Sequence, residues 1–175
     1  MRVSAKADYA ARAAAELSTA TDKPIKADRI ARAQDIPAKF LETILLELKH
    51  AGIVRSQRGP EGGYALARPA EDISVADVIR AVDGPLANVR GDRPENMEYH
   101  GAAEPLTDVW IAVRAALRDI LETTTLANLR DGELPPRVAE LADDPEAWVS
   151  LGRIRGAAPS GGRKSAQPKV SSAKS

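Results

Sequence analysis

The feature that most constrains this sequence is a run of turn-forming residues, Arg58 to Gly63, between two short alternating segments. Glycine and proline dominate the run, so we expect the chain to reverse direction there. Residues 53–57 and 64–67 then pair as the two strands of a β-hairpin. A phosphate-binding loop is the competing interpretation, but no Lys-Ser/Thr pair follows the glycines and the next element is a strand. The run therefore predicts a hairpin with a basic residue, Arg58, at its tip.

Three helical patterns precede the hairpin. Apolar residues recur at helical spacing over residues 4–18, and a short helix is expected over residues 27–33. A third helix begins with Pro37 at its first position, where a missing N–H costs nothing, and ends near Ala51 before Gly52. Its expected buried stripe is Phe40, Leu41, Ile44, Leu45 and Leu48, and its expected outer face is Lys39, Glu42, Thr43 and Glu47. This order of helices followed by a basic hairpin is typical of a winged helix-turn-helix.

The second half of the chain predicts more helices around one long loop. Ser74 is expected to cap a helix that ends at residues 83–85, and residues 88–104 lack periodicity and are expected to form a loop. A long helix follows over residues 105–122, and Thr125 is expected to cap a short last helix. The apolar stripe of the long helix is Leu106, Val109, Trp110, Val113, Leu117, Ile120 and Leu121. Packing on its own domain is the alternative, but its length favours pairing with a second copy.

We therefore expect a mainly α fold with a small β-hairpin wing (α+β). The expected parts are a winged helix-turn-helix DNA-binding domain over residues 1–85, a loop over 86–104, a dimerisation helix with a short following helix over 105–131, a C-terminal extension over 132–155, and a disordered basic tail over 156–175. The tail is rich in Gly, Ser, Pro and Lys, which is why no packed structure is expected there.

Composition excludes several classes of protein. The chain has no cysteine and two histidines, which removes disulfides, thiol nucleophiles and thiolate metal sites. No apolar run approaches the ~20 residues of a membrane span, and the first residues lack a signal-peptide core, so we expect a cytoplasmic protein without a membrane partner. No paired His/Asp, nucleophile motif or phosphate cradle is present, so we expect no enzyme.

A net charge of zero hides an uneven distribution. Residues 1–68 carry four more basic than acidic side chains, residues 91–151 carry eight more acidic ones, and residues 152–175 carry six basic residues and no acid. A polyanion would therefore meet the front and the tail of the chain rather than its middle. The tail is as well explained by solubility as by phosphate contacts.

The exposed side chains of the third helix match the chemistry of base recognition. In a helix-turn-helix the second helix of the motif enters the major groove. Lys39 can donate to guanine, Glu42 can accept from cytosine, and Thr43 can touch a thymine methyl, although a merely solvated face is the plain alternative. Arg58 at the wing tip suits a narrow minor groove. The full expected DNA-binding set is Arg2, Lys6, Tyr9, Lys39, Glu42, Thr43, Arg55, Gln57, Arg58, Gly59, Gly62 and Gly63.

These segments resemble the Rrf2 family of bacterial winged-helix regulators, which includes iron–sulfur, nitric-oxide and cysteine-metabolism repressors. The similarity lies in Met1-Arg2-Val3-Ser4, Asp8-Tyr9-Ala10, Phe40-Leu41-Glu42 and above all in residues 54–64, and it extends to about residue 130. The resemblance implies a homodimeric repressor on a palindromic operator. It also implies that Lys39, Glu42, Thr43 and Arg58 read the DNA.

The chain departs from the sensor members of that family in one respect. Those members carry three cysteines in the loop before the long helix, whereas residues 88–104 contain none. We therefore expect a member without a cluster or other cofactor, which responds to a metabolite, to a partner protein or to no effector at all. Asp8 matches a further ligand position of some relatives, but its place at a helix start explains it better. A metal sensor using Asp8 and His100 stays open, as does a winged-helix module that binds a protein and would need an apolar third helix.

Overall fold

The computed structural model describes residues 3–20 and 23–149. Its helices and strands are α1 (Ala5–Ser18), α2 (Ala27–Gln34), α3 (Ala38–His50), β1 (Val54–Gln57), β2 (Gly63–Leu66), α4 (Val75–Asp83), α5 (Leu106–Leu121), α6 (Leu126–Asp131) and α7 (Pro136–Asp143). Short 3-10 turns lie at η1 (Ala70–Asp72), η2 (Pro94–Asn96), η3 (Gly101–Ala103) and η4 (Pro145–Trp148). The predicted fold class, mainly helical with one hairpin, is confirmed. Arg2 and the predicted basic tail lie outside the described residues.

Side-chain caps define where three of the helices begin. Ser4 caps α1 and accepts a hydrogen bond from the backbone N–H of Ala7 at 2.9 Å. Ser74 caps α4 and Thr125 caps α6, as the sequence predicts, and the structure shows that each cap is a reciprocal capping box. The prediction for Pro37 was wrong by one position: its extended ψ of 128° makes it the residue before α3.

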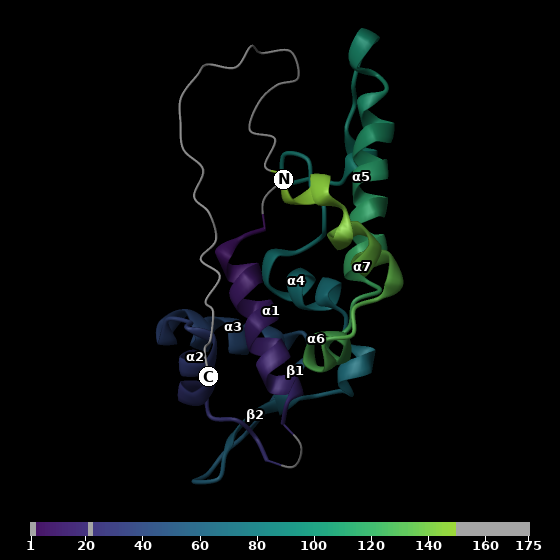
Figure 1. Ribbon diagram of the computed structural model, residues 1–175. Helices are drawn as coiled ribbons and strands as arrows, with labels where there is room; N and C mark the ends of the chain where they lie inside the picture. The colour runs from purple at the N-terminus through teal and green to yellow at the C-terminus, as the bar shows by residue number, and fades with distance from the viewer. Residues whose placement is uncertain (1–2, 21–22, 150–175) are drawn as a thin grey trace, which may run out of the picture.

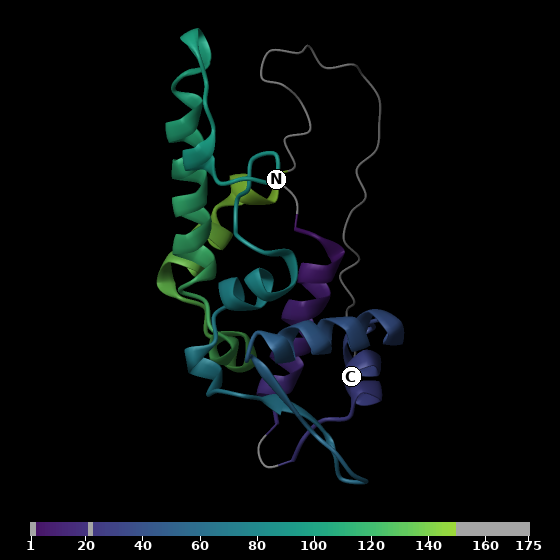
Figure 2. The ribbon, with the colours of Figure 1, turned by 180° about the vertical axis from the view of Figure 1, so that it is seen from behind.

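Alanine on α1 allows four other helices to pack around it. The buried face of α1 includes Ala7, Ala10, Ala13 and Ala14, each at most 1% exposed. With such small side chains at the contact, helix axes approach closely. Figures 1 and 2 show α1 running through the winged part, with α2 and α3 beside it and α4 and α6 across from them. Leu126 of α6 is fully buried in this core, so the chain returns to the winged part after α5.

The hairpin is tied to the helix-turn-helix by backbone hydrogen bonds. Strands β1 and β2 pair antiparallel from Val54↔Leu66 to Gln57↔Gly63. Ile25 and Tyr64 exchange two backbone hydrogen bonds of 2.8 Å, which add the segment before α2 to the edge of β2. A Cβ at Gly63 would lie 2.5 Å from the carbonyl oxygen of Ile25, so only glycine allows this approach. These contacts fix the position of the wing relative to the segment that precedes α2.

The long helix α5 projects away from the winged part (Figure 1). It has no buried residue within its bounds. Its contacts include the loop before it, where the indole N–H of Trp110 donates to the Tyr99 hydroxyl at 3.1 Å, and α4, where Arg80 pairs with Glu122 just after α5. The predicted loop over residues 88–104 is correct except for η2 and η3. None of the described helices combines the length and apolar character that crossing a bilayer requires.

Candidate DNA-binding surface

The first turns of α3 present the three side chains predicted to read bases. Lys39, Glu42 and Thr43 are exposed, whereas Leu41, Ile44, Leu45 and Leu48 on the opposite side are at most 1% exposed. The Thr43 hydroxyl donates to the carbonyl of Lys39 at 3.3 Å. The helix is therefore anchored along one face and offers a polar face at its N-terminal end, the end that reaches base edges in helix-turn-helix proteins.

Phe40 was expected in the buried stripe of α3, and that expectation was wrong. Its side chain is 56% exposed, because it lies at the edge of the stripe and the four residues at its centre already fill the space against α1. Leu46 on the outer side of α3 is also 53% exposed. The outer surface of α3 is thus mixed, with two large apolar side chains among polar ones, whereas the sequence predicts only the polar residues Lys39, Glu42, Thr43 and Glu47 there.

The N-terminal half of α1 lies beside this end of α3. The ammonium of Lys6 pairs with Glu47 of α3 at 2.9 Å. The Tyr9 ring meets the Phe40 ring edge-on, with centroids 6.2 Å apart, and the Arg12 guanidinium lies 4.8 Å from the Tyr9 centroid. Lys6 and Tyr9, both predicted to contact DNA, therefore lie next to the exposed end of α3.

Arg12 connects α1 to the end of α2. Its guanidinium donates to the carbonyl of Gln34 at 2.9 Å and pairs with Asp8 at 3.1 Å. Asp8 lies in the first turn of α1, where a negative charge is favourable. These contacts give Asp8 a structural role in its own helix.

The wing carries Arg55, Gln57 and Arg58 on its exposed surface. The Nε of Arg55 donates to the carbonyl of Leu66 across the hairpin at 3.2 Å. At the tip, the N–H of Gly62 donates to the carbonyl of Gly59 at 2.9 Å, which closes a tight turn. Within the described part of the chain, neither Arg55 nor Arg58 takes part in an ion pair.

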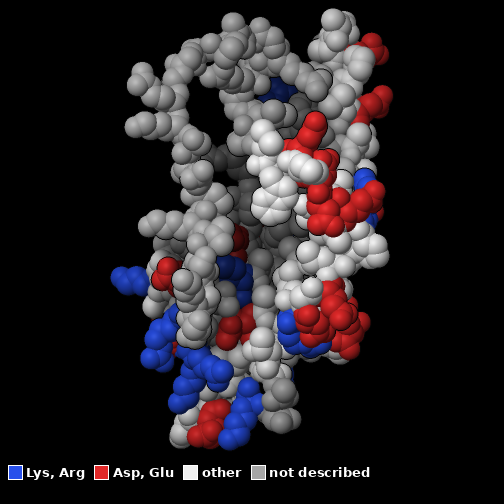
Figure 3. Space-filling view, viewed as in Figure 1, with Lys and Arg blue, Asp and Glu red and all other residues white. Residues whose placement is uncertain are grey.

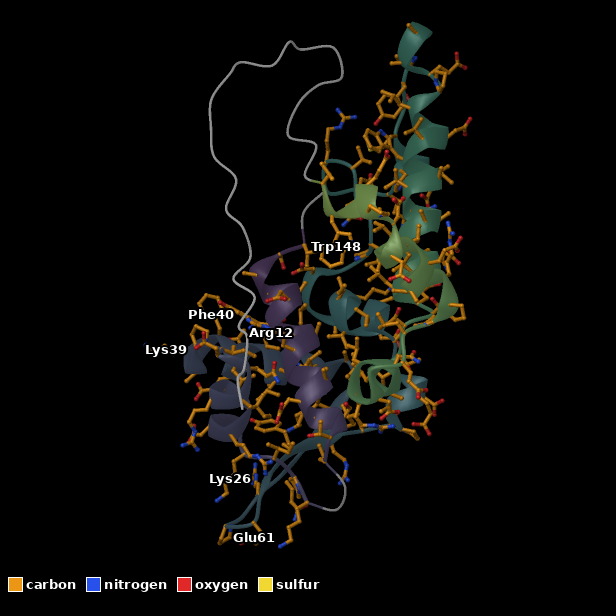
Figure 4. All side chains as sticks on the ribbon, viewed as in Figure 1. Arg12, Lys26, Lys39, Phe40, Glu61 and Trp148 are labelled. Atoms are coloured by element: carbon orange, nitrogen blue, oxygen red, sulfur yellow. The ribbon has the colours of Figure 1, made fainter. Side chains whose placement is uncertain are left out.

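Sequence reasoning missed a second group of cations, on α2 and at the residue that precedes it. Lys26, Arg29 and Arg32 are exposed and, among residues 3–20 and 23–149, have no ion-pair partner. Figure 3 shows blue side chains gathered over the end of the molecule formed by α2 and the hairpin, and Figure 4 places Lys26 above Glu61 of the wing. Their three-residue spacing, which places them on one side of a helix, was the signal that could have found them.

Two acidic residues of the loop before α5, Asp92 and Glu95, are engaged within the protein. Asp92 accepts hydrogen bonds from the Asn96 amide and the Arg93 backbone N–H, which lower the pKa of its carboxyl group. Glu95 pairs with Arg114 of α5, and the pKa of Glu95 is lowered by a backbone hydrogen bond and by this arginine. Within the described residues no three His, Cys, Asp or Glu side chains form a metal-binding group. Since the chain has no cysteine, its residues do not fit an iron–sulfur cluster.

The residues predicted for dimerisation follow one side of α5 and differ in how far they are exposed. Leu106 and Val109 are 36% and 48% exposed. The other five, which are partly buried in one copy of the chain, are Trp110, Val113, Leu117, Ile120 and Leu121. Ile111, which the predicted stripe does not include, is 37% exposed on another side of the helix.

Comparison with known proteins identifies the family. The Rrf2 family, described as "Iron-dependent Transcriptional regulator", matches residues 3–132. The chain belongs to the Rrf2 family. It is 53% identical over 151 residues to the putative HTH-type transcriptional regulator Rv1287 of Mycobacterium tuberculosis, covering 86% of this chain and 94% of that protein. It is 32% identical to the HTH-type transcriptional regulator CymR of Bacillus subtilis, covering 76% and 94%.

Solved structures of Rrf2 proteins share the fold. The structure of CymR, the global cysteine regulator of B. subtilis, has a TM-score of 0.64 at 30% identity and covers 75% of this chain and 98% of that one. The structure of T. potens IscR has a TM-score of 0.60 at 29% identity and covers 87% and 94%. The predicted family and winged-helix fold are confirmed, and the chain is a DNA-binding transcription regulator of the Rrf2 family.

Proposed function

We propose that this Rrf2 protein is a homodimeric repressor that binds a palindromic operator. The observation that carries the proposal is the distribution of unpaired charge. The cations of α2, α3 and the wing lack ion-pair partners within the described residues, whereas each arginine of α5, α6 and α7 is paired with a carboxylate. Exposed cations without partners are those that release counterions when they meet phosphates.

The N-terminal half of α3 enters the major groove in this proposal. Lys39, Glu42 and Thr43 face the base edges, and Arg58 enters the adjacent minor groove. Phosphate contacts come from Lys6, Tyr9, Arg55 and Gln57, from the backbone at Gly59, Gly62 and Gly63, and from the cations of α2. Arg2 is included on the sequence prediction alone.

Two copies pair through α5. The support is that α5 has no buried residue although much of it is apolar, including Leu106 and Val109. A two-fold axis between such helices places the two copies of α3 at half-sites about one helical turn apart. Residues 1–85 then act as the DNA-binding part and residues 105–131 as the part that holds the dimer together.

The signal that controls binding is a metabolite or a partner protein rather than an iron–sulfur cluster. The absence of cysteine supports this part of the proposal. The relatives are transcription regulators from bacteria, which supports a cytoplasmic protein that acts on DNA and has no catalytic activity.

The test begins with DNA from upstream of the protein's own gene, searched for an inverted repeat. Fluorescence anisotropy with that duplex and with a scrambled one, at several salt concentrations, measures affinity and specificity. Affinity should fall steeply with salt, and the operator should bind at least roughly 1,000-fold more tightly than the scrambled duplex. A protein that is monomeric in solution and binds neither duplex at low salt would contradict the proposal.

A further inference from the structure

Phe40 is an apolar side chain in the position where a DNA-reading helix meets its target. It lies in the first turn of α3 and is 56% exposed. Figure 4 shows it beside Lys39 at the outer end of α3, on the side toward Arg12 of α1. A single exposed apolar residue needs no special explanation, so its surroundings decide what it does.

The ring is held in place before any partner arrives. Tyr9 contacts it edge-on at 6.2 Å with an angle of 64° between the rings, and Arg12 stacks on Tyr9 from α1 at 4.8 Å. Edge-to-face pairs and cation–π contacts of this kind restrict the aromatic rings that form them. Binding a ligand that packs on Phe40 therefore costs little conformational entropy in ordering the ring.

The ring forms part of a hollow whose chemistry is that of a nucleotide partner. The hollow has a volume of about 290 Å³ and is lined by Lys6, Lys39, Phe40, Thr43 and Ile44. Its lining combines apolar side chains with two lysines, of which Lys6 is paired with Glu47 and Lys39 has no ion-pair partner within the described residues. In the major groove only thymine offers an apolar group, its C5-methyl, and a phosphate lies close to every base. The positive charge in this lining thus favours DNA over an apolar protein surface.

We propose that Phe40 is a specificity-determining residue that packs on the C5-methyl group of a thymine in each half-site. The inference rests on the proposed DNA-binding function and adds a base preference that the polar side chains of α3 do not supply alone. Thr43 lines the same hollow, about one turn of α3 beyond Phe40.

The experiment separates this inference from the function on which it rests. A pool of random duplexes is selected with the wild-type protein, and the strongest binder is resynthesised with each thymine replaced in turn by deoxyuridine, which pairs identically but lacks the methyl group. For the wild type, one symmetry-related thymine pair should lose about three- to five-fold in affinity per methyl group, the value of burying about one carbon. For Phe40→Ala, thymine and deoxyuridine at that position should bind equally.

Two further variants serve as controls. Phe40→Leu keeps an apolar side chain and should retain part of the methyl preference. Trp148, 80% exposed in η4 and far from α3 in Figure 4, provides an exposed aromatic outside the hollow, so Trp148→Ala should keep the full preference. Circular dichroism and Tm establish that each variant is folded, which the exposure of both rings favours.

Three results would overturn the inference while the function stands. These are a selected sequence without thymine in the half-site, a full set of deoxyuridine duplexes with wild-type affinity, and a methyl preference that survives Phe40→Ala. An equal loss of affinity for every duplex in Phe40→Ala would also overturn it and would mean that the ring contacts the sugar–phosphate backbone. Failure of the wild type to select any sequence would instead reject the proposed function itself.

Discussion

The winged half of this protein, residues 3–83, and the segment from α5 to α7 differ in what they leave exposed. The winged half buries a continuous apolar core and, within the described residues, leaves the cations of α2, α3 and the wing without ionic partners. Helices α5 and α7 have no buried residue, yet Arg114, Arg118 and Arg137 each pair with a carboxylate. The winged half buries a core and keeps cations without partners, whereas the segment from α5 to α7 pairs its arginines and keeps apolar side chains of α5 exposed.

This difference indicates that the two regions of the chain bind different partners. Unpaired surface cations gain most when they meet a polyanion, because counterions are released into solution. Exposed apolar side chains gain most when they are removed from water, at roughly 25 cal/mol per Å². The first region is thus suited to DNA and the second to another copy of the protein. Each assignment can be tested by substitutions within its own region.

The largest effect is expected from a charge placed on the exposed apolar side of α5. Val109→Glu should convert the dimer into a monomer, because a carboxylate would be buried without a partner. Because a monomer has only one winged helix-turn-helix to contact the operator, operator affinity should fall about 100-fold or more. Multi-angle light scattering and anisotropy measure the two effects. Ile111→Glu, on another side of the helix, should change neither, and a dimeric Val109→Glu protein would contradict the assignment of this face.

The wing should give the next largest effect. Arg58→Ala should weaken operator binding about tenfold, because the variant removes a charge from a narrow minor groove. The slope of log affinity against log salt should also become shallower by about one for each phosphate that the arginine neutralises. Arg137→Ala removes a paired arginine from α7 and should alter neither value. Equal effects of the two substitutions would remove the distinction between the two regions.

The cations of α2 should have a smaller and less selective effect. Arg29→Ala is expected to weaken binding about three-fold to operator and scrambled duplex alike, because phosphate contacts carry no sequence information. Anisotropy with both duplexes checks this. Arg130→Ala, which removes an arginine paired with Asp131, is the matched control. A decrease confined to the operator would mean that α2 reads bases.

Thr43 should affect base preference more than affinity. Thr43→Ala is expected to relax selection at one position of each half-site, because the variant lacks the hydroxyl and the methyl group that meet the base, with about a two- to three-fold drop in discrimination. Sequencing the duplexes selected by each protein measures the change. An unaltered base preference would place Thr43 on the solvated side of α3.

Much of the fold was predictable from local signals in the sequence. The run from Arg58 to Gly63 permits little other than a tight hairpin, and Ser74 and Thr125 mark helix starts through side-chain caps that need only their neighbours. Phe40 was misplaced because periodicity does not distinguish the centre of an apolar stripe from its edge. The decisive facts were the alanine face of α1 and the position of Tyr9, which lie far from Phe40 in the chain.

The binding surface was less predictable than the fold for a similar reason. A charge pattern indicates which cations share a face, but not which have a carboxylate partner. Lys6 and Glu47 belong to different helices, and their pairing follows from how α1 and α3 pack. Lys26 and Arg29 were missed because α2 was judged by its apolar side alone.

The smallest expected effect concerns the contact that connects α5 to α4 of the winged half. Glu122, just after α5, accepts hydrogen bonds from Arg80 of α4 and from Arg118, and these hold the pKa of its carboxyl group below its usual value of 4.5. A lowered pKa in the folded state means that the contact stabilises the protein above the unfolded pKa and that this gain disappears as the pH falls through the folded pKa. Glu122→Gln should therefore lower the Tm by only about 1–2 °C at pH 7, as for other exposed pairs, and the difference from the wild type should shrink as the pH falls below about 4. Glu140→Gln, which breaks a pair inside α7, should not reproduce this pH-dependent change in Tm.

A Tm difference for Glu122→Gln that stays constant down to low pH would mean that hydrogen-bond geometry, rather than ionic attraction, connects α5 to the winged half.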